Sequence, residues 1–80
     1  MKIPVIKQLV NAYTDEQLEK AELALLQEGE LEIDIAGEDE GEQLTNVMAA
    51  KWIKEEMTQR SSDLNTAIRA YSQKVRNSIS

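Results

Sequence analysis

The chain has 80 residues, a net charge of −6 and no cysteine or histidine, which excludes disulfides, thiolate nucleophiles and histidine-based catalysis. This length suits one domain over residues 1–80. Its core is expected to be thin, because a chain of this size buries only about 60% of the surface that its unfolded form exposes. Oligomerisation is the most available further source of stability. No apolar run reaches the roughly 18–20 residues of a membrane span, and residues 1–7 are too short for a signal peptide, so we expect a cytoplasmic protein with no membrane contact.

Two helices are predicted for the N-terminal third of the chain. A proline suited to a first turn and apolar residues at helical spacing predict a helix over Ile3–Ala12, with an N-terminal strand of β-branched residues as the alternative. Thr14 and Gln17 form a capping-box signature, so the second helix is expected over Asp15–Glu28, with Gly29 as the residue that ends it. Its broad apolar face comprises Leu18, Ala21, Leu23, Ala24, Leu25 and Leu26.

The helical period gives way to strict alternation at residues 31–35. Apolar residues at positions 31, 33 and 35 alternate with carboxylates, a pattern typical of a half-buried strand. The alternative is an extended loop that docks the three apolar side chains on the helices. A lone strand would leave its backbone groups unpaired, so the strand interpretation requires a partner strand from a second copy of the chain.

A helical pattern returns at Gln43 and continues toward Met57. Its apolar residues spread over most of the helix circumference: Leu44, Val47, Met48, Ala50, Trp52, Ile53 and Met57. A helix that is apolar on several sides is packed by neighbours or by a second chain. We therefore expect a homodimer with Val47, Met48 and Trp52 at its core, the single tryptophan acting as the interface anchor.

The last helix is expected to begin near Asp63, with Ser61 or Ser62 as its N-cap. It has one apolar stripe, formed by Leu64, Ala67, Ile68, Tyr71, Val75 and Ile79. Arg69, Lys74 and Arg76 place positive charge toward the C-terminal end of this helix, where the helix dipole favours cations. Together these patterns predict a mainly all-α fold: a bundle of about four helices with one short strand or extended segment at 31–35.

Acidic and basic residues occupy different parts of the chain. Residues 14–43 hold twelve carboxylates and one lysine, whereas the rest holds eight Lys or Arg and three carboxylates. Such a division calls for neutralisation within the fold, across a second copy or by a basic partner. An acidic connecting segment at 29–42 carries Glu38, Asp39, Glu40 and Glu42, which we expect to form an acidic patch that binds a basic protein surface. The acidic net charge argues against nucleic acid.

The same carboxylates raise the alternative of a calcium site. Together with Asp34 they supply hard oxygen ligands, but their spacing does not fit an EF-hand loop. Counted from Asp34, the third position is Ala36 and the sixth, where that loop has glycine, is Asp39. We therefore predict no metal ligand, no cofactor and no catalytic residue.

Four segments of the chain resemble a family of short, acidic bacterial proteins of unknown function. They are MKIPVIK at 1–7, GEDEGEQLT at 37–45, AAKWI at 49–53 and KVRNSI at 74–79. The resemblance spans nearly the whole chain and implies membership of that family and a bacterial origin. It implies no activity, cofactor or site residue.

Three functions are compatible with these patterns. We expect a non-enzymatic homodimer that acts as a protein-interaction module through its acidic patch. The alternative is an accessory or regulatory subunit of a larger enzyme or ribosomal partner, bound through the same patch. The least favoured is a carboxylate-based metal-binding protein or enzyme, because exposed carboxylates on so short a chain offer no enclosed cleft.

Overall fold

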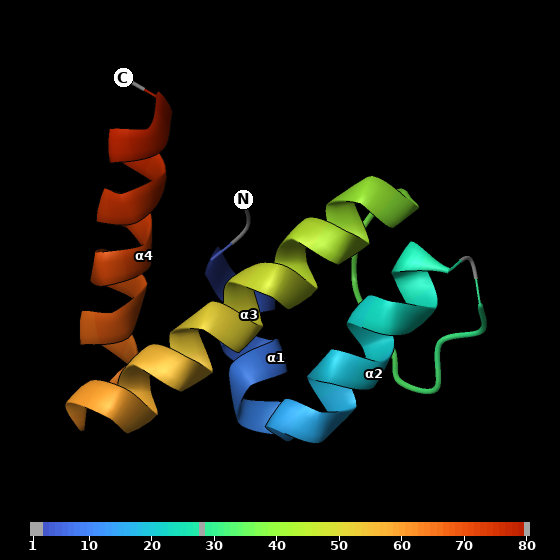
Figure 1. Ribbon diagram of the computed structural model, residues 1–80, viewed down its shortest axis with the longest axis horizontal. Helices are drawn as coiled ribbons and strands as arrows, with labels where there is room; N and C mark the ends of the chain where they lie inside the picture. Colours follow the sequence, from blue (N-terminus) through green and yellow to red (C-terminus); the bar gives the residue numbers. More distant parts are fainter. Residues whose placement is uncertain (1–2, 28, 80) are drawn as a thin grey trace.

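The computed structural model describes residues 3–27 and 29–79, which contain four α-helices and no strand (Figure 1). In chain order they are α1 (Ile3–Ala12), α2 (Asp15–Leu26), α3 (Glu40–Arg60) and α4 (Leu64–Ile79). The predicted all-α fold is confirmed, and the N-terminal segment forms a helix rather than a strand. None of the described helices is long and apolar enough to cross a membrane.

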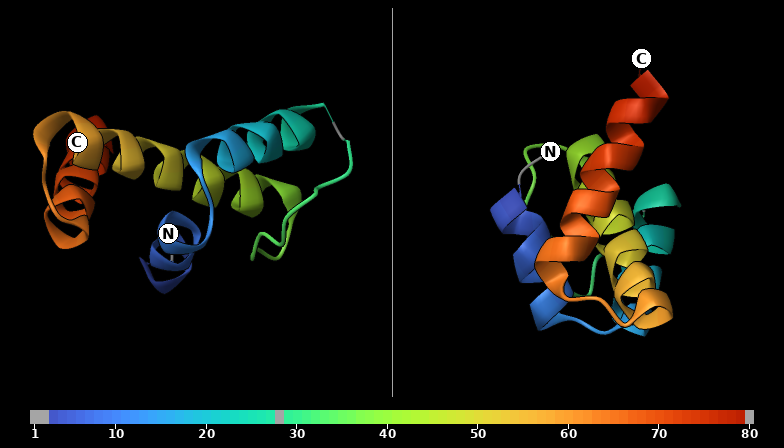
Figure 2. Two further views of the ribbon diagram at one scale, coloured as in Figure 1. Left: turned by 90° about the horizontal axis from the view of Figure 1, so that it is seen from below. Right: turned by 90° about the vertical axis from the view of Figure 1, so that its left-hand side faces the viewer.

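The central helix is α3, against which α1, α2 and α4 all pack. α2 runs antiparallel beside its N-terminal half, α1 crosses its middle, and α4 lies at its C-terminal end (Figures 1 and 2). Ala49 and Ala50 are fully buried on α3 and allow the neighbouring helices to approach closely. Helices of the same chain therefore cover much of the apolar circumference of α3, although Met48 stays 51% exposed.

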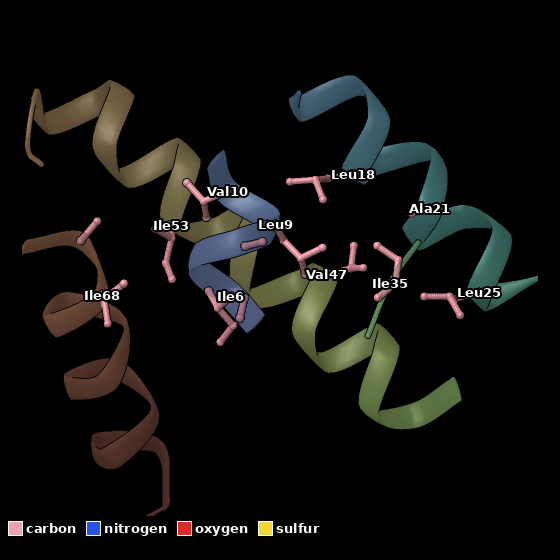
Figure 3. Packing of buried hydrophobic residues seen from close by; sticks show 13 residues of the cluster. Ile6, Leu9, Val10, Leu18, Ala21, Leu25, Ile35, Val47, Ile53 and Ile68 are labelled. Atoms are coloured by element: carbon pink, nitrogen blue, oxygen red, sulfur yellow. The ribbon is translucent and has the colours of Figure 1, made fainter. Parts of the chain in front are cut away.

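The hydrophobic core is continuous around α3 (Figure 3). α1, α2 and the segment between α2 and α3 contribute Ile6, Leu9, Val10, Leu18, Ala21, Leu25 and Ile35. α3 and α4 contribute Val47, Ala49, Ala50, Ile53, Ala67 and Ile68. Full burial of one such aliphatic side chain stabilises the fold by about 1.5–3 kcal/mol, before entropy is counted. This core fixes α2 and the segment that follows it.

Two lysines of α3 connect it to the N-terminal helices. The Lys51 ammonium forms an ion pair with the Glu22 carboxylate of α2 at 2.7 Å. The Lys54 ammonium donates to the Val10 carbonyl oxygen in the last turn of α1 at 3.2 Å. A cation at this end of a helix satisfies a free carbonyl and interacts favourably with the helix dipole.

The start of α2 is as predicted, and its end comes earlier. The Thr14 hydroxyl accepts from the Gln17 N–H at 3.2 Å, and the Gln17 side chain accepts from the Thr14 N–H at 2.9 Å. The helix ends at Leu26, and the Gly29 N–H donates to the Ala24 carbonyl at 2.7 Å. This bond is typical of a helix end in which glycine lies one position farther along than predicted. Glu28, the predicted last residue, lies outside the described residues.

The prediction that the third helix begins at Gln43 was wrong, because α3 begins at Glu40. The Asp39 carboxylate is its N-cap and accepts from the Glu42 N–H at 2.8 Å. Carboxylates in the first turn, here Glu40 and Glu42, are favourable beside the positive end of the helix dipole. The acidic connection is therefore shorter than the predicted 29–42, and its last carboxylates belong to α3.

The predicted serine cap of the last helix was also wrong. The Asp63 carboxylate accepts from the Thr66 N–H at 2.8 Å and caps α4. Hydrogen bonds from the Thr66 side chain and N–H lower the pKa of Asp63. Ser61 instead ends α3 in the left-handed conformation, with φ 50°, and the Ser62 N–H donates to the Met57 carbonyl at 3.2 Å.

Candidate functional site

Residues 31–35 form the docked loop, and the strand interpretation was wrong for this segment. Ile35 is 3% exposed and belongs to the core. The Gln43 amide donates to the Ile35 carbonyl at 2.9 Å, and the Asn46 amide donates to the Ala36 carbonyl at the same distance. Side chains of α3 thus take the place of a partner strand and satisfy the loop backbone.

Gly37 follows directly and brings the loop against the start of α3. A Cβ atom at this position would lie 2.9 Å from the Gln43 backbone nitrogen and 2.7 Å from its Cγ. Real Cβ atoms do not approach backbone so closely, so only glycine fits here. The turn at Gly37 places the acidic residues that follow at the N-terminus of α3.

The predicted acidic patch lies at this N-terminus. Glu38, Asp39 and Glu40 are exposed, Glu42 is half-buried, and the Glu38 N–H donates to the Glu42 carboxylate at 3.4 Å. Two of these carboxylates therefore hold the helix start. Among residues 3–27 and 29–79, no group of three or more acidic side chains is arranged to hold a metal ion. Binding of a partner by this patch stays a prediction.

The three residues predicted for a dimer core have different surroundings. Val47 is 0% exposed and lies inside the core of its own chain, so it has no surface left for a second copy. Trp52 packs its ring 5.5 Å from the Tyr71 ring, with the Lys74 ammonium 5.6 Å from its ring centroid. Met48 is 51% exposed. Homodimerisation itself stays a prediction.

A groove that the sequence analysis missed lies between α2 and residues 29–33. Its volume is about 780 Å³. Apolar side chains and carboxylates line it together: Leu23, Ala24, Ile33, Glu16, Glu30 and Glu32. Figure 1 shows the loop after α2 returning along that helix. The helix α2 forms one wall of the groove, and this loop forms the other. The groove can therefore offer apolar contact and negative charge to one ligand.

The charge of this groove is largely unneutralised. Glu30 and Glu32 are exposed and form no ion pair or side-chain hydrogen bond with a described residue. Lys20 is the one cation among the lining residues, and its ammonium lies 3.5 Å from the Glu16 carboxylate. Leu23 is 48% exposed, so it offers apolar surface to a ligand beside these carboxylates. The one signal for the groove in the sequence was Leu23, an apolar residue of α2 that lies outside the buried face formed by Leu18, Ala21 and Leu25.

Comparison with known proteins agrees with the resemblance seen in the sequence. The model of a family of unknown function matches residues 1–80, the full chain. No curated protein and no solved structure matches the chain. The chain therefore belongs to DUF6952, a family of unknown function.

Proposed function

We propose that this chain is a non-enzymatic protein-interaction module, active as a homodimer, whose groove between α2 and residues 29–33 binds a basic amphipathic segment of a protein. The observation that supports this most is that one groove combines half-exposed Leu23 with the carboxylates of Glu30 and Glu32, which pair with no described residue. An amphipathic helix binds such a groove with its apolar face and adds contacts from its charged flanks.

The carboxylates of Glu38 and Glu40 have a different part in this proposal. They are exposed and lie at the start of α3, in the same acidic half of the chain as the groove. Charges outside the contact surface raise the association rate more than they raise the affinity. The acidic patch thus attracts a basic partner, and the groove holds it.

A titration with a synthetic Leu/Lys peptide of helical amphipathic spacing tests the proposal. Amide resonances of the isotope-labelled chain should shift at Leu23, Glu30 and Glu32, and the affinity should fall steeply with added salt, because the contact is between opposite charges. The double variant Glu30→Lys/Glu32→Lys should lose this binding, whereas an all-glutamate analogue of the peptide should not bind the unmodified chain. Shifts confined to α4, or binding indifferent to the double variant, would contradict the proposal.

A further inference from the structure

α4 carries positive charge that forms no ion pair with the part of the chain that the structure describes. Its charged residues are Arg69, Lys74 and Arg76, and it holds no carboxylate. None of the three forms an ion pair with another described residue, although the charge of Arg69 contributes to lowering the pKa of Asp63. Lys74 lies over the Trp52 ring, which leaves Arg69 and Arg76 as exposed cations.

Arg69 and Arg76 belong to the same face of α4. They are seven residues apart, which is about two helical turns, and that face is opposite the one on which Ala67 and Ile68 are buried against the core. Val75 is half-buried and belongs to the same stripe as Ala67 and Ile68, away from the two arginines. The exposed face of α4 is thus basic, and its charge is opposite to that of the groove.

α4 and the groove lie at opposite ends of the molecule. Figure 1 shows α4 beyond the C-terminal half of α3, and the loop that walls the groove beyond the other half. The view in Figure 2 from below agrees. One chain therefore cannot place its own α4 in its own groove, and a protein group that neutralises both must come from a second molecule.

We infer that the groove is filled by α4 of a second copy of this chain, reciprocally, in a twofold dimer. This inference rests on the proposed function and names the occupant of the same groove. In an isologous dimer each contact occurs twice, so one antiparallel arrangement neutralises both grooves and both α4 helices. Arg69 and Arg76 meet Glu30 and Glu32 of the other copy. An external basic segment then competes with α4.

Charge reversal in the full-length chain tests this arrangement. One variant reverses the groove, Glu30→Lys/Glu32→Lys, and the other reverses α4, Arg69→Glu/Arg76→Glu. Sedimentation velocity should give twice the mass of one chain for the unmodified protein. Each variant alone should associate roughly tenfold or more weakly, because like charges then face each other. A 1:1 mixture of the two should regain the dimer, because each α4 again meets a groove of opposite sign.

A matched control separates the groove from general acidity. Glu38→Lys/Glu40→Lys changes the net charge as much as the groove variant does, outside the groove lining, and should keep the dimer. Circular dichroism checks that every variant folds. If the reversed variants unfold, the neutral pair Glu30→Gln/Glu32→Gln should still weaken association, and unchanged association would overturn the inference.

The results separate the two proposals. A mixture that associates no better than its components, or a monomeric unmodified chain, overturns the inference. If that chain still binds the Leu/Lys peptide in the groove, the groove part of the proposed function stands with a different occupant, and a monomeric chain removes only its homodimer part. If it binds neither peptide nor a second copy, both proposals fall.

Discussion

The Asn46 side chain of α3 donates to the Ala36 carbonyl at 2.9 Å, and so fixes the loop that forms one wall of the groove. Asn46 is 1% exposed, the one buried polar residue in the described core. Its amide replaces the hydrogen bond that a neighbouring strand would give. The groove therefore depends on the amides of Asn46 and Gln43 as well as on the core contact of Ile35.

Replacing Asn46→Ala should loosen this wall. The Ala36 carbonyl would lose its donor, and because Ala36 is exposed to water the loss is that of one ordinary hydrogen bond, about 0.5–1.5 kcal/mol. Urea unfolding measures the loss of stability, and hydrogen exchange should show faster opening of residues 31–36. Thr45→Ala is the control, because Thr45 is exposed and bonds only within its own helix, to the Gly41 carbonyl. Equal effects of the two substitutions would contradict the role given to Asn46.

Gly37→Ala should destabilise the chain because the added methyl group meets the Gln43 backbone. Overpacking of this kind costs about 1–3 kcal/mol. Gly41→Ala is the matched control: a Cβ there meets only the Asp39 carboxylate, at 3.4 Å, and alanine favours the helix. The midpoint temperature of thermal unfolding should therefore be the same for Gly41→Ala as for the unmodified chain, or higher. A Gly37→Ala variant as stable as the unmodified chain would show that the loop adopts another path.

How much the sequence could predict depended on how local each signal was. The Thr14 cap and the apolar stripe of α4 are visible in a few neighbouring residues, and both were predicted. The start of α3 was missed because Glu40 and Glu42 add nothing to apolar periodicity, although Asp39 before them was a legible N-cap signal. The groove depends on the path of residues 29–33 back along α2, and no local pattern contains that path.

Ser61→Gly should stabilise the protein. Ser61 holds the left-handed conformation, φ 50°, in which a residue with a Cβ costs roughly 1–2 kcal/mol more than glycine. Part of this gain is lost to the greater entropy of glycine in the unfolded chain. Denaturant unfolding should show a net increase, and Ser72→Gly inside α4 should show a decrease. A less stable Ser61→Gly variant would contradict the αL end of α3.

The Asp63 cap should give α4 a pH dependence. Because the folded pKa lies below the ordinary carboxyl value, the stabilisation is fully present above the unfolded pKa and is lost as the pH falls through the folded one. Asp63→Ala should therefore lower stability at neutral pH and differ less from the unmodified chain in acid. Unfolding curves from neutral to acidic pH provide the measurement, and a difference independent of pH would contradict the charged cap.

Trp52→Ala should loosen α4 from α3. Truncation of a fully buried tryptophan lowers the free energy of unfolding by about 3–5 kcal/mol, and truncation of half-buried Trp52 should lower it by less. Hydrogen exchange should become faster mainly in α4, because the Tyr71 ring and Lys74 lose their support. If dimerisation uses α4 as inferred, association should weaken with it. Unchanged exchange in α4 would contradict this packing.

The most direct measurement is a cross-link between the groove and α4 of two different copies. The chain has no cysteine, so single substitutions place a thiol uniquely. Gln27→Cys lies in the groove lining, and Gln73→Cys lies on the exposed side of α4. A disulfide forms only where the two Cα atoms come within about 7 Å of each other. We expect the mixed species, which joins one variant to the other, to form fastest under mild oxidation. Cross-links that form equally fast within either variant alone, or none in the mixture, would contradict α4 as the occupant of the groove.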